Sequence, residues 1–541
     1  MRIQTLALLL LAVPAAAQQP RQLTAEDYAR AERRLAPYTT PLVSGLAGPP
    51  TWTADGRFWY RSSTPQGAAY WVVDPARGTR EPLFDPARLA PALGTAAGRE
   101  IPASQLPIQG LDLTEDGRRA TVTVRGERFT CDLQAYTCTR AASSMADAIV
   151  SPDGRMAAFI RDYNLWVREL ASGAERQLTT DGVRDFGYAT NNAGWVHGDD
   201  PVLTWSPDSR QIATFQHDGR GVGDMYLVST NVGHPRLDAW KYPLPGDSVI
   251  FRLHRVVVNV AGAPRVVRFQ MPADPHRSTV SDHVQCEGGS VCDLQWFPDG
   301  SKVAFVSSSR DHKTAWVRVA DARTGEVRTL FDERSQTQIG DASFNERLWR
   351  VVPGSAELIW WSQREGWTQL YLHDLSTGRL KNRITTGDGN VMDIVRVDEQ
   401  RRVLYFTAQG KEAGRDPYYQ HLYRIGFDGR GQTLLTPEEA HHTVSMSPDG
   451  RFFVDTYSTP DTPPVTVLRD MNGRVVRPLE RADVSRLAAT GWRPPTLIRM
   501  KARDGQTDIY GLMFTPSALD STKKYPIVNY IYPGPQVGSV G

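Results

Sequence analysis

The chain has 541 residues, of which 40% are hydrophobic and 23% charged, a composition typical of a soluble globular protein. Its 62 basic and 60 acidic residues leave a net charge of +2 without a long run of one sign, so neither a nucleic-acid surface nor an acidic tail is indicated. Because this length exceeds what one ordinary hydrophobic core can hold, we expect a large repeat domain or several domains.

Residues 1–17 have the features of a secretory signal peptide. Arg2 supplies the positive end, residues 6–13 an apolar stretch, and Ala15-Ala16-Ala17 a small-residue cleavage site. The apolar stretch is far shorter than the roughly 20 residues that a membrane-spanning helix needs. The sequence therefore predicts an exported protein, periplasmic or secreted, with no membrane span after removal of the signal.

Residues 18–44 predict a helical segment ahead of the main domain. Thr24 and Asp27 resemble a capping box for a helix over residues 24–35, and Pro37 would end that helix. The apolar face of the helix carries Tyr28, Ala31 and Leu35. We expect this face to pack on another domain.

The four cysteines form two local pairs, Cys131 with Cys138 and Cys286 with Cys292. In an oxidising compartment each pair would close a short loop and stabilise the fold by about 2–3 kcal/mol on the chain-entropy model. Zinc is the competing interpretation, but neither pair has CxxC spacing and no histidine cluster accompanies them. The sequence favours two disulfides.

An internal repeat is the most informative feature of the chain. A Ser-Pro-Asp-Gly type of turn recurs, each time followed by a short apolar strand, and its chemistry is that of a tight turn: proline sets φ, aspartate bonds nearby backbone and glycine adopts a positive φ at low cost. The clear copies are Ser151-Pro152-Asp153-Gly154, Ser206-Pro207-Asp208-Ser209, Phe297-Pro298-Asp299-Gly300 and Ser447-Pro448-Asp449-Gly450. The weaker copies are Ala54-Asp55-Gly56, Glu115-Asp116-Gly117, Pro353-Gly354-Ser355 and Asp398-Glu399-Gln400.

A second hairpin follows most copies, as in Leu165-Trp166-Val167 before Ser172-Gly173. Two hairpins make a four-stranded antiparallel sheet, and a ring of such sheets buries both faces of each one. The predicted fold class is therefore all-β: an eight-bladed β-propeller over residues 45–490, with seven blades still open and a β-sandwich as the alternative. The long gap between the copies at Asp208 and Asp299 indicates an insertion.

The pattern changes over residues 491–541. Residues 496–502 and 509–514, separated by Arg503-Asp504-Gly505, predict a β-hairpin, and residues 527–532 predict an apolar strand. A closed propeller has no need of these strands. They are interpreted as the opening of a mixed sheet.

Several segments together resemble one family. Four segments are similar to serine peptidases of the prolyl oligopeptidase family, dipeptidyl-peptidase IV branch. Two lie near the C-terminal end: Lys524-Tyr525-Pro526 and the run from Tyr530 to Gln536. The other two lie upstream: Ser362-Gln363-Arg364-Glu365-Gly366-Trp367 and Tyr419-Gln420-His421-Leu422-Tyr423. The resemblance covers nearly the whole mature chain. It implies an eight-bladed propeller capping an α/β-hydrolase domain, of which residues 491–541 would be the incomplete start.

By this resemblance, Tyr532 donates its hydroxyl to the oxyanion of the tetrahedral intermediate. Such a donor on a rigid strand end contributes roughly 3–4 kcal/mol to transition-state stabilisation. A hydrolase serine needs a Gly-x-Ser-x-Gly elbow, and the 541 residues contain none. We therefore expect the triad Ser, Asp and His to lie outside this sequence, the fragment alone to be inactive and the parent protein to be a serine-type peptidase.

Asp199 and Asp200 occupy the place where the family carries two glutamates that bind the free amino terminus of the substrate. Two carboxylates could pair with an ammonium group, although aspartates must start closer to it. The alternative is an exposed acidic loop ahead of Pro201. Release of N-terminal dipeptides is thus one hypothesis, and endopeptidase action is another.

The remaining expectations concern partners and cofactors. We expect a peptide substrate, no cofactor, no metal and no nucleic acid, with a homodimer formed through the hydrolase domain as one possibility. His441-His442 are interpreted as strand-edge residues without an accompanying carboxylate, and Trp360-Trp361 as core. The alternative function is a non-catalytic exported propeller that binds a protein or ligand.

Overall fold

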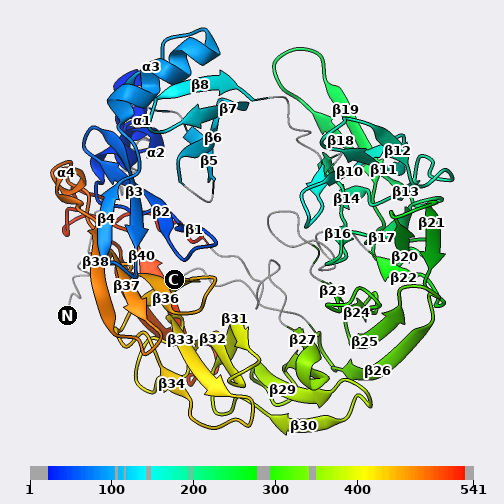
Figure 1. Ribbon diagram of the computed structural model, residues 1–541. Helices are drawn as coiled ribbons and strands as arrows, with labels where there is room; N and C mark the ends of the chain where they lie inside the picture. Colours follow the sequence, from blue (N-terminus) through cyan, green and yellow to red (C-terminus); the bar gives the residue numbers. More distant parts are fainter. Residues whose placement is uncertain are drawn as a thin grey trace, which may run out of the picture.

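The computed structural model describes residues 22–103, 106, 108–114, 117–141, 148–193, 196–198, 200–276, 291, 293–339 and 349–530. Within these residues the chain forms eight antiparallel sheets arranged as a ring (Figure 1). Each sheet is contiguous in sequence, so no strand is exchanged between the first and last blades. The predicted eight-bladed β-propeller is confirmed, and the seven-bladed and sandwich alternatives are wrong.

The first four blades are numbered in chain order. Blade 1 consists of β1 (Thr51–Trp52), β2 (Phe58–Thr64), β3 (Gly67–Asp74) and β4 (Thr79–Pro82). Blade 2 consists of β5 (Ile108–Leu113), β6 (Arg119–Val124), β7 (Glu127–Asp132) and β8 (Thr137–Arg140). Blade 3 consists of β9 (Ile149–Val150), β10 (Met156–Arg161), β11 (Asn164–Glu169) and β12 (Glu175–Gln177). Blade 4 consists of β13 (Phe186–Tyr188), β16 (Thr204–Trp205), β17 (Gln211–Asp218), β20 (Phe251–Asn259), β21 (Arg265–Arg268) and β22 (Asp274–His276).

The other four blades have four strands each. Blade 5 consists of β23 (Leu294–Trp296), β24 (Lys302–Ser308), β25 (Thr314–Asp321) and β26 (Val327–Arg334). Blade 6 consists of β27 (Arg350–Val352), β28 (Glu357–Ser362), β29 (Gln369–Asp374) and β30 (Leu380–Arg383). Blade 7 consists of β31 (Asn390–Asp398), β32 (Val403–Gln409), β33 (Gln420–Gly426) and β34 (Thr433–Leu434). Blade 8 consists of β35 (His441–Met446), β36 (Phe452–Thr459), β37 (Thr462–Asp470) and β38 (Val475–Arg481).

The repeated turns lie between the first two strands of their blades, except in blade 4, where the turn over residues 206–209 joins β16 to β17. In blade 3 the hydroxyl of Ser151 donates to Asp153 (2.6 Å) and accepts from the backbone N–H of Met156 (3.0 Å). The carboxylate of Asp153 also accepts from the N–H of Arg155 (3.1 Å). These bonds satisfy the turn locally, so each copy can start the strand that follows it.

Hydrophobic clusters hold neighbouring blades together, and each contact between two blades is called a seam below. Clusters of buried side chains fill the seams 1–2, 3–4, 4–5, 5–6, 6–7 and 7–8. The ring closes between blades 8 and 1, where Phe58 and Tyr60 pack on Val454 and Leu468. An ion pair between Arg80 and Glu480 spans the same seam. As predicted, Trp360 and Trp361 are buried core residues.

Four α-helices in the described part of the chain precede, join or follow the blades of the ring. The helix α1 (Ala25–Glu32) has the predicted capping box of Thr24 and Asp27, but it ends before the predicted residue 35 and is followed by α2 (Ala36–Thr39) and the 3₁₀ turn η1 (Thr40–Leu42). Tyr28 of α1 and Leu35, which precedes α2, are both exposed. The helix α3 (Pro86–Ala97), which was not predicted, lies between blades 1 and 2 and buries its apolar face in their shared cluster. Another 3₁₀ turn, η4 (Pro353–Ser355), connects β27 to β28 in blade 6, and α4 (Ser485–Ala488) follows blade 8.

The predicted disulfide between Cys131 and Cys138 is present. The two residues face each other in the β7–β8 ladder, so the pairing follows from the register of the hairpin. Cys286 and Cys292 lie outside the described residues.

The chain leaves blade 8 and forms a separate two-stranded sheet, β39 (Thr496–Lys501) with β40 (Asp508–Met513), which confirms the predicted hairpin. The hairpin joins none of the blades through strand pairing. Its apolar side chains are largely uncovered, among them Met500, Ile509 and Phe514. No helix in the described part of the chain is long and apolar enough to cross a membrane.

Candidate functional site

The predicted amine-binding pair belongs to an insertion that interrupts the innermost strand position of blade 4. The insertion runs from β13 to β16 and contains the hairpin of β14 (Asn191–Ala193) and β15 (Val196–Gly198). Asp200 is exposed, whereas Asp199 lies outside the described residues. Their role as an ammonium site thus stays a prediction.

Tyr532 also lies outside the described residues. The strand predicted over residues 527–532 is not formed in its described part, because residues 527–530 pair with no other strand. Ile527, Val528 and Tyr530 are almost fully exposed. An apolar strand needs a hydrogen-bonding neighbour, and the described residues supply none here.

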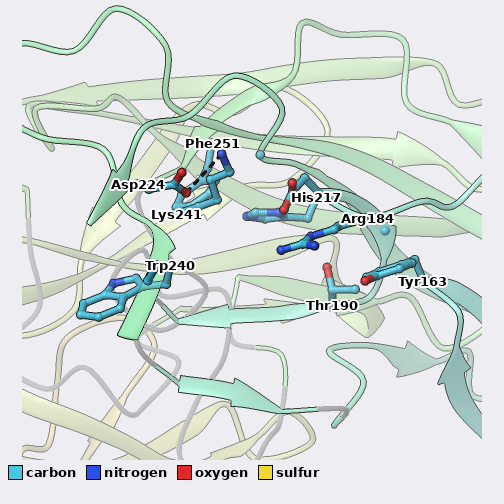
Figure 2. Close-up of a pocket in the computed structure, with 12 residues that line it drawn as sticks. Tyr163, Arg184, Thr190, His217, Asp224, Trp240, Lys241 and Phe251 are labelled. Carbon is cyan, nitrogen blue, oxygen red and sulfur yellow. Dashed lines mark ion pairs between the residues drawn. The ribbon is translucent and has the colours of Figure 1, made fainter. Parts of the chain in front are cut away.

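A cavity of about 460 Å³ lies on blade 4, at the base of a second insertion (Figure 2). This insertion is the hairpin of β18 (Asp224–Ser229) and β19 (Arg236–Lys241), which accounts for part of the predicted long gap between the turns. The cavity is lined by Tyr163, Arg184, Asp185, Gly187, Thr190, His217, Gly219, Asp224, Ala239, Trp240, Lys241 and Phe251. These residues come from blade 3, blade 4 and the inserted hairpin, so sequence spacing alone could not bring them together.

Two glycines keep the wall of this cavity open. A Cβ at Gly187 would lie 2.7 Å from Cγ2 of Thr190, and a Cβ at Gly219 would lie 3.1 Å from the ring of Phe251. Any larger residue would therefore displace a side chain that lines the cavity. The ring of Phe251 packs at 4.8 Å from that of His217, which gives this wall an aromatic surface.

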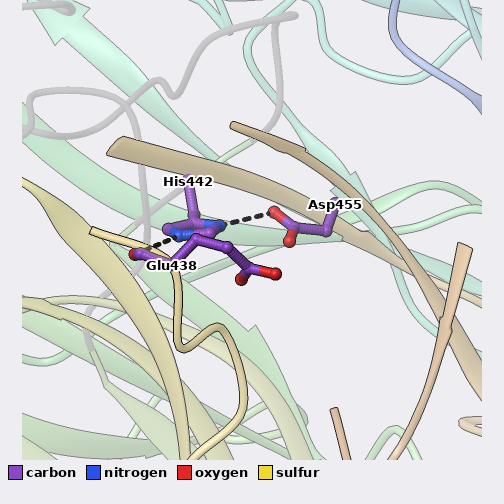
Figure 3. Close-up of side chains that lie close together, drawn as sticks. All are labelled: Glu438, His442 and Asp455. Carbon is purple, nitrogen blue, oxygen red and sulfur yellow. Dashed lines mark hydrogen bonds and ion pairs between the residues drawn. The ribbon is translucent and has the colours of Figure 1, made fainter. Parts of the chain in front are cut away.

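A second group of titratable side chains lies on blade 8 and on the segment that leads into it from blade 7 (Figure 3). His442 is fully buried, with Nδ1 2.8 Å from Oδ1 of Asp455 and Nε2 3.0 Å from the backbone carbonyl of Glu438. The interpretation of His441-His442 as strand-edge residues without a carboxylate is thus wrong for His442. Asp455 stands on β36, which pairs with β35, and this register could not be seen from the spacing.

The side chains of Glu438, His442 and Asp455 are close enough together to suit a metal ion. However, Arg469 already places its guanidinium among them, donating to Asp455 (2.8 Å) and to Glu438 (2.7 Å). Burial raises the pKa of Glu438, but the hydrogen bonds it accepts and the positive charge of Arg469 together outweigh burial and hold the pKa below its usual value. The cluster is an ion-pair network in which arginine supplies the cation.

The fold places the chain among the eight-bladed β-propeller proteins, with two hairpins inserted in blade 4. A model of the dipeptidyl peptidase IV N-terminal region matches residues 114–464. The chain belongs to this family.

Curated relatives carry names of the same family. A protein named "Probable dipeptidyl-aminopeptidase B" from Aspergillus clavatus is 24% identical over 442 residues, covering 76% of this chain and 47% of the relative. Dipeptidyl-aminopeptidase B of Aspergillus niger is 24% identical over 540 residues, covering 92% and 58%. The chain therefore spans about half the length of the curated relatives it matches.

The fold is similar to that of Porphyromonas gingivalis dipeptidyl peptidase 4, with a TM-score of 0.63 at 18% identity. The match covers 89% of this chain and 66% of the solved structure. At this identity the likeness supports the ring architecture alone.

Proposed function

We propose that the chain is the substrate-gating propeller portion of an exported serine-type peptidase that hydrolyses peptides. The observation that carries the proposal is the match to the dipeptidyl peptidase IV N-terminal region, which runs from the end of β5 in blade 2 to the start of β37 in blade 8. The relatives of this region are named dipeptidyl-aminopeptidases. The finer assignments below are hypotheses that follow from it.

The exposed hairpin β39–β40 supports a further domain beside the ring. Met500, Ile509, Met513 and Phe514 are between 45% and 72% exposed, an unusual concentration of apolar surface on one small hairpin. Such a surface gains stability when a neighbouring sheet covers it. We propose that residues 491–541 open an α/β-hydrolase domain, with Ser, Asp and His of the triad supplied by sequence outside these 541 residues.

Within that domain, Tyr532 would donate to the oxyanion. Its substitution by phenylalanine removes the hydroxyl and keeps the aromatic side chain otherwise unchanged. In the full-length protein, Tyr532→Phe is expected to lower kcat by about a hundredfold while sparing KM, because the hydroxyl would act only in the transition state. Tyr530→Phe, two residues away, is the matched control.

Steady-state kinetics on a dipeptidyl p-nitroanilide tests the assignment. Full turnover in Tyr532→Phe would remove the oxyanion role. Failure of the full-length protein to cleave any peptide substrate would remove the peptidase function itself.

The choice between dipeptide release and endopeptidase action depends on Asp199 and Asp200. If these carboxylates bind the substrate ammonium group, acetylation of the substrate amino terminus should abolish cleavage. The double variant Asp199→Asn/Asp200→Asn should then lose the preference for free over acetylated substrate. Equal rates on free and acetylated substrates in the unaltered protein would favour an endopeptidase.

A further inference from the structure

The hydrogen bonds of His442 on blade 8 fix a positive charge on its ring. Nδ1 lies 2.8 Å from the carboxylate of Asp455, and Nε2 lies 3.0 Å from the backbone carbonyl of Glu438 (Figure 3). A carbonyl oxygen only accepts, and the guanidinium of Arg469, which donates to the same Asp455 (2.8 Å), keeps that carboxylate ionised. Both ring nitrogens of His442 therefore carry hydrogens, which makes the ring an imidazolium.

The network around this imidazolium is balanced in charge. His442 and Arg469 supply two positive charges, and Asp455 and Glu438 supply two negative charges, with Arg469 bonded to both carboxylates. The side chains of His442, Asp455 and Arg469 are at most 2% exposed. Because a buried network of this kind depends on matched charges, a further positive charge beside it is strongly opposed.

A second histidine lies against His442 from the neighbouring blade. His421 stands on β33 of blade 7, and its ring centre is 5.1 Å from that of His442. Its Nδ1 lies 2.9 Å from the backbone carbonyl of Thr436, and its buried Nε2 has no hydrogen-bond partner among the described residues. This arrangement suits a neutral ring, since a proton on Nε2 would find no acceptor there.

Burial and the charge of His442 act on His421 in the same direction. Burial, the larger cause, and His442 both lower the pKa of His421, whereas the hydrogen bond to Thr436 raises it. Two other charged groups face His421: Arg415 lowers its pKa and Glu412 raises it. The net effect is a lowered pKa.

His441 and Tyr457 also lie beside His442. The ring centre of Tyr457 is 5.2 Å from that of His442. Burial, and after it the charge of His442, lowers the pKa of His441, which precedes His442 on β35. Because successive side chains of a strand point to opposite faces, His441 does not share the face on which His442 meets His421.

The two histidines lie on segments that also contact the C-terminal hairpin. Tyr418, in the loop before β33, has its ring centre 5.4 Å from that of Tyr510 on β40. Tyr419 of the same loop and Glu439, in the connection from blade 7 to blade 8, line a cavity of about 240 Å³ together with Leu497 of β39. A change at the 7–8 seam therefore reaches the place where the hairpin meets the ring.

We propose that His421 and His442 form an acid-sensitive switch across the seam between blades 7 and 8. At neutral pH the uncharged ring of His421 packs against the fixed cation of His442. In acid, a proton on His421 places two positive charges 5.1 Å apart in a buried site, and opening of the seam relieves their repulsion. The opening loosens the hold of the ring on the hairpin β39–β40, and the switch stands whether or not the parent protein cleaves peptides.

The direction of the pH effect follows from the lowered pKa of His421. A histidine that binds its proton less readily in the folded state stabilises the seam above pH 6.5, the usual pKa of the group, and this stability is lost as the pH falls below that value. Each pH unit below it favours the open seam by up to about tenfold. The opening constant of the 7–8 seam should therefore rise about tenfold between about pH 7.5 and about pH 5.5.

Hydrogen exchange of the backbone amides of β33 and β35 measures this opening, after correction for the intrinsic pH dependence of exchange. His421→Asn, whose amide can replace Nδ1 as the donor to Thr436, should lose most of the tenfold acid response. His441→Asn should keep most of it, since His441 lies on the other face of β35.

His373→Asn is the matched control. His373 on β29 of blade 6 is also buried, with Nδ1 3.0 Å from the carbonyl of Gly378 and with Nε2 unpartnered in the described part of the chain. Its ring stacks on Phe331 at 4.3 Å instead of on a histidine. The variant should leave the acid response of the 7–8 seam at about tenfold.

The fixed charge of His442 has its own measurement in the unaltered protein. With isotope-labelled histidine, nuclear magnetic resonance at about pH 7.5 should show two ring N–H signals for His442 and one for His421. The variants His442→Gln and His421→Asn assign these signals by their loss.

The proposal is overturned if protection of the 7–8 seam does not change between the two pH values, or if His421→Asn keeps the full acid response. It is also overturned if His442 shows a single ring N–H signal, or if His373→Asn removes the response as completely as His421→Asn. Unchanged protection of blade 6 in His421→Asn shows that the variant is folded.

Discussion

The seam between blades 6 and 7 and the seam between blades 2 and 3 are built in opposite ways. In the 6–7 seam, Leu370 and Leu372 of blade 6 meet Leu404 and Phe406 of blade 7 in a fully buried cluster. None of the hydrophobic clusters in the described residues contains side chains of both blade 2 and blade 3. The same blade architecture thus carries a buried hydrophobic contact between blades 6 and 7, whereas the described residues of blades 2 and 3 share no hydrophobic cluster.

Blade 2 shows how strand alternation produces the difference. Ala120, Val122 and Val124 on β6 point toward blade 1 and α3, where they join a buried cluster. The alternate residues Thr121 and Thr123 therefore face blade 3, since successive side chains of a strand point to opposite faces. These two positions are half-buried and polar, so the face cannot contribute to a hydrophobic core.

Side chains of blade 3 itself cover the face of this blade that is turned away from blade 4. Phe159 and Trp166 are paired across β10 and β11 on the side away from blade 4. The guanidinium of Arg161 lies 5.1 and 4.8 Å from their ring centres. Arg161 and Arg168 both pair with Glu175, which fixes this layer in place. The aromatic surface is thereby shielded without help from blade 2.

The comparison teaches that the ring does not depend equally on all its seams. Blade 2 derives its stability from blade 1, α3 and its disulfide, and blade 3 from blade 4. We infer that the 2–3 seam is lined with water and contributes little to global stability. Three substitutions and one labelling experiment can break or sharpen this inference.

The largest effect is expected from Leu404→Ala in the 6–7 seam. Leu404 is fully buried, and its truncation should cost about 2–5 kcal/mol through lost burial and a cavity. Thr121→Ala in the 2–3 seam is the matched control, with an expected cost below about 1 kcal/mol. Urea unfolding midpoints measure the stability of both variants. Equal losses of stability in the two variants would contradict the contrast between the 6–7 and 2–3 seams.

Removal of the blade 2 disulfide should have the next largest effect. Cys131 and Cys138 are separated by seven positions, and closing so short a loop stabilises by about 2–3 kcal/mol on the chain-entropy model. Cys131→Ser/Cys138→Ser should lower the stability of blade 2, as local hydrogen exchange would report. Blades 6 and 7 should keep their protection, and a uniform loss around the ring would show that the 2–3 seam transmits stability after all.

A smaller effect is expected from Glu357→Gln at the 6–7 seam. Glu357 of β28 pairs with Lys381 of its own blade and accepts from Arg402 of blade 7 (2.8 and 3.1 Å). The substitution should cost about 1–2 kcal/mol at neutral pH, because the hydrogen bonds to two cations are weakened. Thermal unfolding measures the loss.

The same variant has a defined pH dependence. Burial raises the pKa of Glu357, but the hydrogen bonds from Arg402 and Lys381 outweigh it and lower the pKa from 4.5 to about 2. A carboxylate whose pKa is depressed in the folded state stabilises the folded protein above pH 4.5. This contribution to the free energy of unfolding is lost as the pH falls toward 2. The difference in thermal stability between the unaltered protein and Glu357→Gln should therefore shrink as the pH falls from 4.5 to about 2. A constant difference down to pH 2 would contradict the ion-pair role.

The sequence predicted the ring because its turns are satisfied within a few residues. In the last copy, for example, Ser447 donates to Asp449 (2.6 Å) and accepts from the N–H of Phe452 (3.0 Å), so the signal is local. The helix α3 was missed although Asp85 caps it and Gly98 ends it in a left-handed conformation. Its signals were readable, but they lay inside a region assigned to blades.

The site residues were less predictable. The contact of His442 with Asp455 depends on the register of two paired strands, which 13 positions of separation do not reveal. Arg184 and Asp185 belong to no motif, and their cavity exists because two insertions of blade 4 enclose it with blade 3. Such sites need coordinates, since tertiary neighbours and not local chemistry define them.

Cysteine labelling tests the contrast between the two seams most directly. Thr123→Cys and Ala408→Cys place single thiols on the second strands of blades 2 and 7, at the 2–3 and 6–7 seams. If the 2–3 seam is lined with water, Thr123→Cys should react with iodoacetamide within about tenfold of the rate of an unfolded peptide, whereas Ala408→Cys should react only through rare opening, about a thousandfold more slowly. Equal protection of the two thiols in the folded protein would contradict the account.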